Sequence, residues 1–190
     1  MKQVEVRLCF GPEEIWPVGR LAEVGQRRYV EYDASFLVRG LPLSPFRLPL
    51  QAGAIEHRDR DFGPLPGVFE DSLPDGWGRL LMDRHFRQQG REPAAVSVLD
   101  RLLWLGTRTL GALIYHPAVP GDPAAALDLP SLLHQATAIH AGAAAVVLPQ
   151  LLRAGGSPGG ARPKLLVGLR DSDAGEGSVA DVDTVYSGED

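Results

Sequence analysis

Apolar and polar positions alternate over the first part of the chain. Near the N-terminus every second residue is apolar: Val4, Val6, Leu8 and Phe10. This period of two is typical of a half-buried strand. After the break at Gly11-Pro12, the ranges 15–24 and 27–32 give two further strand candidates. Prolines at 42, 45 and 49 favour extended segments over helix. Residues 1 to about 60 are therefore predicted to form a small antiparallel sheet or partial barrel.

A helical period replaces this alternation after Pro74. Asp75 is placed to cap a first helix, and Gly90 is placed to end it. Pro93 fits the first turn of a second helix, which ends at Gly106. The apolar face of this second helix is predicted to hold Ala95, Leu99, Leu102 and Leu103. A short strand is predicted over 110–115.

Prolines 117, 120 and 123 mark a linker, so the main domain boundary is predicted near 117–127. The first domain then covers residues 1–117 and the second 128–170. Within the second, a helix is predicted to begin at Asp128 and end at Gly142, with an apolar face formed by Leu132, Leu133, Ala136 and Ile139. Residues 171–190 form an acidic tail, which is predicted to be flexible. The predicted fold class is α+β.

Charge and composition limit the classes of partner. The net charge is −5, but seven of the 24 acidic residues lie after position 170, which leaves 17 against 19 basic residues. A near-neutral body lacks the basic surface that direct nucleic-acid binding needs. Cys9 is the single cysteine, and the N-terminus has no apolar signal-peptide run. These features predict a cytoplasmic protein. The longest apolar stretch, 141–152, is too short to span a membrane.

A glycine-rich loop at 154–164 is the main candidate for chemistry. Its four glycines allow successive backbone N–H groups to face an anion, and Lys164 adds a positive charge suited to a phosphate. The loop is not a Walker A motif, because Gly160 is followed by Ala161-Arg162 instead of Lys-Ser/Thr. On local chemistry alone, a phosphate-binding loop and an ordinary flexible turn both remain open.

Two tripeptides imitate protein-kinase motifs. His57-Arg58-Asp59 and Asp61-Phe62-Gly63 lie within seven residues of each other and precede the glycine-rich loop. In kinases these motifs lie on separate loops, and the first is followed by an asparagine that holds magnesium. The chain contains no asparagine, so the match is interpreted as coincidence. The histidines and Cys9 show no metal-ligand spacing, and no catalytic or metal-binding residue is assigned.

The chain resembles the HipA toxin kinases of bacterial type II toxin–antitoxin systems over residues 4 to 170. Two segments carry the resemblance most specifically, namely 71–78 (Asp-Ser-Leu-Pro-Asp-Gly-Trp-Gly) and 157–164. Other segments match in the same order: 18–21 (Val-Gly-Arg-Leu), 29–33, 43–50 and 105–113. The resemblance implies a small β-rich N-terminal subdomain with helices, followed by the beginning of a kinase-like N-lobe.

The resemblance also implies site residues and partners. In the family this loop closes over the phosphates of ATP, which here involves Gly159, Gly160, Ala161, Arg162, Pro163 and Lys164. Ser157 corresponds to the autophosphorylation site. ATP and Mg²⁺ are the cofactors expected for the full-length family. The implied partners are a helix-turn-helix antitoxin and an aminoacyl-tRNA synthetase substrate.

The chain departs from the family after the loop. No lysine follows Lys164, and there is no asparagine to hold magnesium. The chain as given is therefore expected to be catalytically incomplete and to bind ATP weakly, as the N-terminal portion of a kinase would. The alternative is a stand-alone, non-catalytic module that docks an antitoxin or a separate kinase chain.

Overall fold

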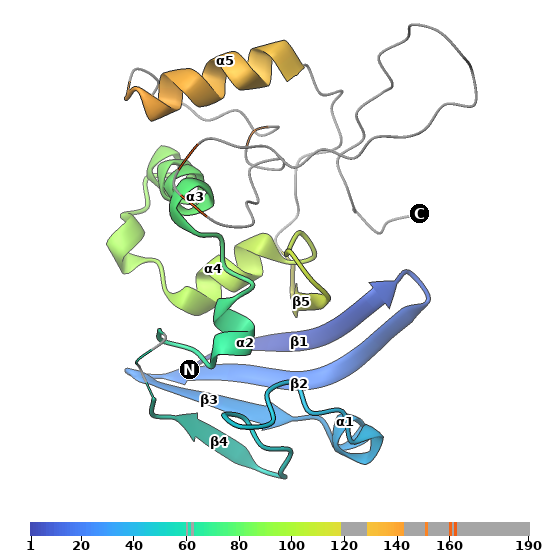
Figure 1. Cartoon of the computed structure of the whole chain (residues 1–190). Helices are drawn as coiled ribbons and strands as arrows, with labels where there is room; N and C mark the ends of the chain where they lie inside the picture. Colours follow the sequence, from blue (N-terminus) through green and yellow to red (C-terminus); the bar gives the residue numbers. More distant parts are fainter. Residues whose placement is uncertain are drawn as a thin grey trace, which may run out of the picture. The chain divides into compact units, whose positions relative to one another are not determined.

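The computed structural model describes residues 1–59, 61, 63–118, 129–142, 151, 160 and 162 (Figure 1). Among these residues the chain divides into two compact units. The first contains Met1–Leu73 and the segment from Val96 to Ala118, whereas the second contains Pro74–Ala95 and the described residues from 129 onward. The domain boundaries at 117, 128 and 170 stay predictions, because residues 119–128 and 163–190 lie outside the described residues.

An antiparallel sheet organises the first unit. Its strands lie in the order β4-β3-β2-β1-β5, so that β4 and β5 form the two ends (Figure 1). The strands are β1 (Lys2–Gly11), β2 (Glu14–Val24), β3 (Arg27–Tyr32), β4 (Ala54–His57) and β5 (Leu113–His116). The predicted alternation in β1 is confirmed from Val4 to Leu8, because Val4, Val6 and Leu8 are buried while Glu5 is exposed. It fails at Phe10, which is 58% exposed where the pairing with β2 shifts register between Cys9 and Gly11. Together with the helices, this sheet confirms the α+β fold class and the β-rich N-terminal subdomain.

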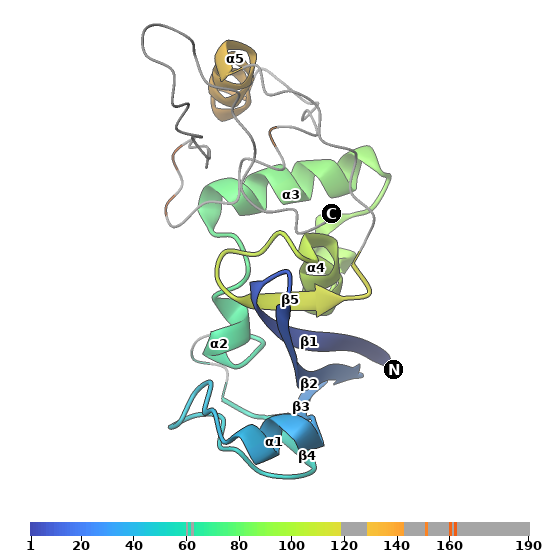
Figure 2. The ribbon, with the colours of Figure 1, turned by 90° about the vertical axis from the view of Figure 1, so that its right-hand side faces the viewer.

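Three helices complete the first unit: α1 (Ala34–Arg39), α2 (Gly67–Glu70) and α4 (Val98–Leu105). Helix α4 contacts β1 and β5, and Figure 2 shows it beside these strands. The core gathers side chains from the sheet and all three helices, including Val6, Leu21, Val30, Phe36, Phe69, Leu99, Leu102 and Tyr115.

Helix α1 was absent from the sequence-based prediction, which assigned only extended structure to the first 60 residues. The helix is six residues long and buries only Phe36, so it is too short to show a helical period. Its start is fixed locally, because the Asp33 carboxylate accepts a hydrogen bond from the Ser35 backbone N–H at 2.8 Å.

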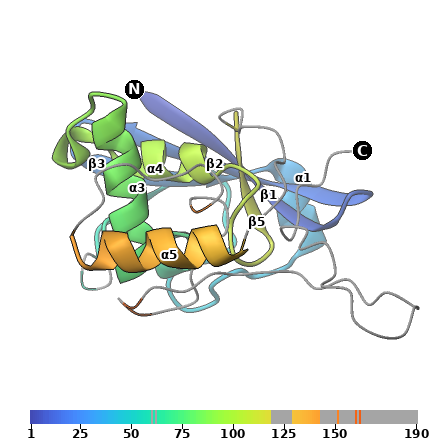
Figure 3. The same ribbon diagram turned by 90° about the horizontal axis from the view of Figure 1, so that it is seen from above.

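The second unit is built on α3 (Gly76–Gln88), a 3₁₀ turn (Pro93–Ala95) and α5 (Leu129–His140). Figure 3 shows α3 and α5 crossing each other. Their buried side chains form a separate core of Trp77, Leu81, Leu132, Ala136, Ile139 and Leu151. The Arg84 guanidinium adds a hydrogen bond to the Ile139 carbonyl oxygen at 3.1 Å.

Three details of the helix predictions are wrong. Asp75 precedes α3, but its side chain makes no capping hydrogen bond. The second predicted helix begins at Val98 and not at Pro93, because Ser97 and Asp100 form a capping box that fixes the first turn. Leu133 is exposed, because it lies one position, or roughly 100° around the helix, from the buried Leu132.

Gly19 occupies a position in β2 that only glycine fits. The pairing of β1 with β2 shifts there, because Val6 faces Gly19 whereas Arg7 faces Pro17. The resulting bulge gives Gly19 a φ of +151°, and a Cβ atom would lie 2.1 Å from the Glu31 carbonyl oxygen of β3. This contact gives a physical reason for the glycine in the Val-Gly-Arg-Leu segment.

Replacing Gly19 by alanine is expected to lower the free energy of unfolding of the first unit by about 2–4 kcal/mol, because the clash adds to the backbone strain. The control is Gly25→Ala, since Gly25 has a φ of +60° but open space around its Cβ position. Only the left-handed strain of about 1–2 kcal/mol applies there. Denaturant unfolding of both variants makes the comparison, and equal losses would contradict the role assigned to the bulge.

The start of β1 is tied to the start of α4 by charge. The Lys2 ammonium lies 2.6 Å from a carboxylate oxygen of Asp100, which also accepts hydrogen bonds from the Ser97 backbone N–H and hydroxyl. Burial acts to raise the pKa of Asp100, but the charge and hydrogen bonds of Lys2 and Ser97 outweigh it. The net effect lowers the pKa of Asp100.

Asp100→Asn is expected to destabilise the protein by about 1–2 kcal/mol at pH 7, where the carboxylate is ionised in both states. The pKa of Asp100 is lower in the folded protein than its unfolded value of about 3.9. The stabilisation by the ionised carboxylate is therefore complete above the unfolded pKa and is lost as the pH falls through the folded-state pKa. Urea unfolding at pH 7, 5 and 3 is expected to show a smaller difference at pH 3. The exposed Asp71→Asn serves as control, and a difference that is constant with pH would contradict the ion pair's contribution.

Candidate functional site

The segment from Phe69 to Leu73 anchors the first half of the 71–78 motif in the first unit. Phe69 is fully buried in the core of that unit. Ser72 is also buried, and its hydroxyl oxygen accepts a 2.7 Å hydrogen bond from the Tyr115 hydroxyl of β5. Burial raises the pKa of Tyr115, so its phenol remains a protonated donor. The serine of the motif therefore has a structural role.

The second half of the motif belongs to the second unit. The boundary between the units falls between Leu73 and Pro74, and Gly76 begins helix α3. Trp77 and Gly78 follow in the first turn, and both are buried. Trp77 is the largest side chain of the second core. One continuous motif thus supplies anchors to two separate cores.

The glycine-rich loop meets this motif at the start of α3. The Trp77 backbone N–H donates a hydrogen bond to the Gly160 carbonyl oxygen at 3.2 Å. The first N–H groups of a helix have no partner within the helix, and the Asp75 side chain does not cap α3. Gly160 supplies one acceptor instead, with a φ of +96° that favours glycine. The two most specific segments of the sequence, far apart along the chain, are thereby brought together.

The remaining loop residues are placed only in part. Gly160 and Arg162 are both exposed, so each is accessible to a ligand, and a guanidinium is a strong donor to phosphate. Ser157, Gly159, Ala161, Pro163 and Lys164 lie outside the described residues. The contact at Trp77 could not be predicted from residue types, because a backbone N–H makes it and not the side chain.

The kinase-like tripeptides lie at the end of the sheet in the first unit. His57 ends β4, and its Nε2 lies 3.4 Å from the Gly63 carbonyl oxygen. Asp59 is paired with Arg47, and Phe62 lies outside the described residues. Among the residues that the structure describes, no group of three His, Cys, Asp or Glu is placed to hold a metal ion. None of the described helices is long and apolar enough to cross a membrane.

A comparison with family models gives one match, which is described as the HipA N-terminal domain and covers residues 14–116. The chain belongs to this family. Among curated proteins, none matches the chain. The range matched to the HipA N-terminal domain contains β2 to β5, the Gly19 bulge and the whole 71–78 motif. The HipA resemblance is thus confirmed for this part, and the glycine-rich loop lies beyond the matched range.

The contact between α3 and the loop can be tested by hydrogen exchange at the Trp77 amide. Gly160→Ala strains a backbone with positive φ and is expected to speed exchange of this amide by roughly tenfold, because the carbonyl acceptor shifts. Gly142→Ala is the matched control, since Gly142 has a φ of +77° just after α5. Equal exchange rates at Trp77 in both variants would contradict the contact.

Proposed function

We propose that the chain is the N-terminal portion of a HipA-like serine/threonine protein kinase toxin of a toxin–antitoxin system. The observation that carries the proposal is the match to the HipA N-terminal domain over residues 14–116. The hydrogen bond between Trp77 and Gly160 supports it further, because it joins the motif inside the matched range to a glycine-rich loop suited to phosphates.

In this proposal the 157–164 loop closes over the phosphates of ATP. Backbone N–H groups of Gly159 and Gly160 face the phosphate oxygens, and Lys164 and Arg162 supply positive charge. Ser157 is the proposed autophosphorylation site. A phosphate on Ser157 adds roughly −1.5 to −2 charges at neutral pH, so it would repel the phosphates of ATP from the same donors.

Phosphoryl transfer is assigned to a longer protein of which this chain supplies the N-terminal part. Transfer needs residues that hold magnesium and orient the attacking hydroxyl, and these 190 residues include no asparagine and no lysine after Lys164. The description of the matched family as an N-terminal domain supports this reading. ATP with Mg²⁺, a helix-turn-helix antitoxin, an aminoacyl-tRNA synthetase substrate and a cytoplasmic location are proposed for that longer protein.

A second candidate is a stand-alone, non-catalytic module that docks an antitoxin or a separate kinase chain. It is favoured by the first unit, which has its own sheet and its own core. The two candidates differ in one measurement, the kinase activity of a separately made catalytic lobe when this chain is added to it. A docking module restores that activity, whereas the N-terminal portion of a kinase restores it only when both parts are joined in one continuous chain.

Calorimetry with ATP and Mg²⁺ tests the proposed role of the loop. We expect a dissociation constant in the millimolar range, because ordering the loop costs about 1–2 kcal/mol per residue against hydrogen bonds of about 1.5–3 kcal/mol each. Lys164→Ala is expected to weaken this binding further.

The charge-matched control is Lys2→Ala, which removes the other lysine of the chain, in the first unit. Equal binding by wild type and Lys164→Ala would contradict the assignment of the loop. A micromolar constant would show that the loop is preformed, and transfer of labelled phosphate to Ser157 would contradict the proposed incompleteness.

A further inference from the structure

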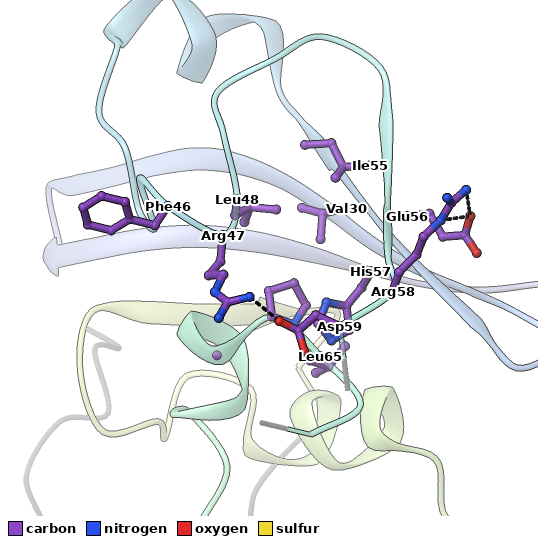
Figure 4. A pocket seen from close by; sticks show the side chains of 12 residues that line it. Val30, Phe46, Arg47, Leu48, Ile55, Glu56, His57, Arg58, Asp59 and Leu65 are labelled. Atoms are coloured by element: carbon purple, nitrogen blue, oxygen red, sulfur yellow. Dashed lines mark hydrogen bonds and ion pairs between the residues drawn. The ribbon is translucent and has the colours of Figure 1, made fainter. Parts of the chain in front are cut away.

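A cavity of about 270 Å³ opens in the first unit beside β4 (Figure 4). It is lined by three stretches of chain that are separate in sequence: residues 46–48, 55–59 and 65–67, together with Val30 of β3. Its apolar part is formed by Val30, Leu48, Ile55 and Leu65. This volume is below the roughly 300–1,000 Å³ typical of pockets for whole small molecules. It suits a single large apolar side chain.

The cavity adjoins the end of the sheet. In the described residues β4 is the last strand of the order β4-β3-β2-β1-β5, and it pairs with β3 through residues 54–57. An end strand has one row of backbone N–H and C=O groups directed away from its neighbour, and an extended peptide can pair with that row. Ile55 and His57 of β4 also line the cavity. A peptide added to β4 would therefore run beside the cavity.

The charge around the cavity favours an acidic partner. Two arginines line the cavity, and the side chains of these residues, Arg47 and Arg58, are 64% and 82% exposed. Arg27 does not line it but pairs with Glu56, which does, and its side chain is 69% exposed. The acids that pair with them are more covered, because Glu56 is 24% and Asp59 is 33% exposed. Asp61 is also exposed and, like Arg27, lies next to the cavity without lining it, since its backbone N–H donates a hydrogen bond to the Asp59 carboxylate. The arginines are thus more exposed than the acids that pair with them, and Figure 4 shows one such pair, the Arg58 guanidinium against the Glu56 carboxylate.

An apolar contact lies next to these charges. Phe46 lines the cavity, yet the residue is 94% exposed, and Figure 4 shows its ring directed away from the Arg47–Asp59 pair. Exposed aromatic side chains are enriched where proteins bind partners. By contrast, the larger hollow of about 690 Å³ over β1, β2 and β3 is lined by the pairs Arg7–Glu5 and Arg20–Glu31. There the acids are about as exposed as the arginines, at 64% and 44% against 41% and 55%, so this hollow favours neither sign of charge.

We propose that β4 and this cavity form a docking surface for an extended acidic segment of a partner protein. The segment adds to β4 as a further strand, places one apolar side chain in the cavity and sets its carboxylates against Arg27, Arg47 and Arg58. The proposal concerns the first unit alone and is independent of nucleotide binding by the loop.

The probe is a short labelled peptide in which Glu alternates with Val around one central Leu, titrated into the full chain by fluorescence anisotropy. We expect this peptide to bind at least tenfold more tightly than the same peptide with Lys in place of Glu. Replacing the central Leu by Ser is expected to weaken binding about tenfold, because the buried apolar side chain is lost. Equal binding of the Glu and Lys peptides, or of the Leu and Ser peptides, would overturn the proposal.

Charge reversal of the protein locates the site. Arg27→Glu and Arg58→Glu are each expected to weaken binding about fivefold, the upper end for an exposed ion pair. Arg7→Glu on β1 is the matched control, with an arginine that is 41% exposed and paired with a glutamate, and it is expected to change binding less than twofold. Hydrogen exchange should slow at the amides of 54–57 and not at those of 113–116. Slowing at β5 alone, or dimerisation of the chain through β4 without peptide, would show a different occupant and refute the proposal.

Discussion

Two buried aromatic side chains, one on either side of Pro74, hold the segment that leads from the first unit into helix α3. Phe69 lies in the core of the first unit and Trp77 in the core of the second. Only a few residues connect them, so each core fixes one end of the same short segment. Burial of the indole fixes the first turn of α3 within the second unit, and the Trp77 N–H in that turn donates a hydrogen bond to the Gly160 carbonyl oxygen. Among the residues that the structure describes, this hydrogen bond joins the range matched to the HipA N-terminal domain to the glycine-rich loop.

Strand positions could be predicted where burial follows a regular period. Burial alternates in β1 from Val4 to Leu8, and β2 and β3 pair on either side of the turn at Gly25. β4 was missed, because it has four residues and only half-buried side chains apart from the exposed Ala54. The start of α4 was misplaced, since Pro93 is a common first residue of helices whereas the deciding contact is the reciprocal hydrogen bonding of Ser97 and Asp100.

The candidate site shows a different limit. Glycine content and Lys164 identify the loop in the sequence. The Trp77 amide cannot be identified in this way, because nearly every residue type carries the same backbone N–H donor. The cavity beside β4 was equally hidden, because it is formed where three separate stretches of chain meet. The role of Ser72 also became visible only through its hydrogen bond to Tyr115, which lies on a strand that enters the sheet from much later in the chain. Contacts of this kind depend on tertiary structure and not on local pattern.

The place of β5 in the sheet has a consequence for how the protein is made. β5 pairs with β1, the first strand to be synthesised, through residues 113–116. As the ribosome adds residues in order, β1 can pair with β2 early, but its other edge stays open until β5 has left the exit tunnel. A nascent chain with an open strand edge is prone to pair with the wrong neighbour. Completion of the first unit is thus tied to the emergence of Tyr115, which closes the edge of β1 and brings Ser72 its hydrogen-bond partner in the same step.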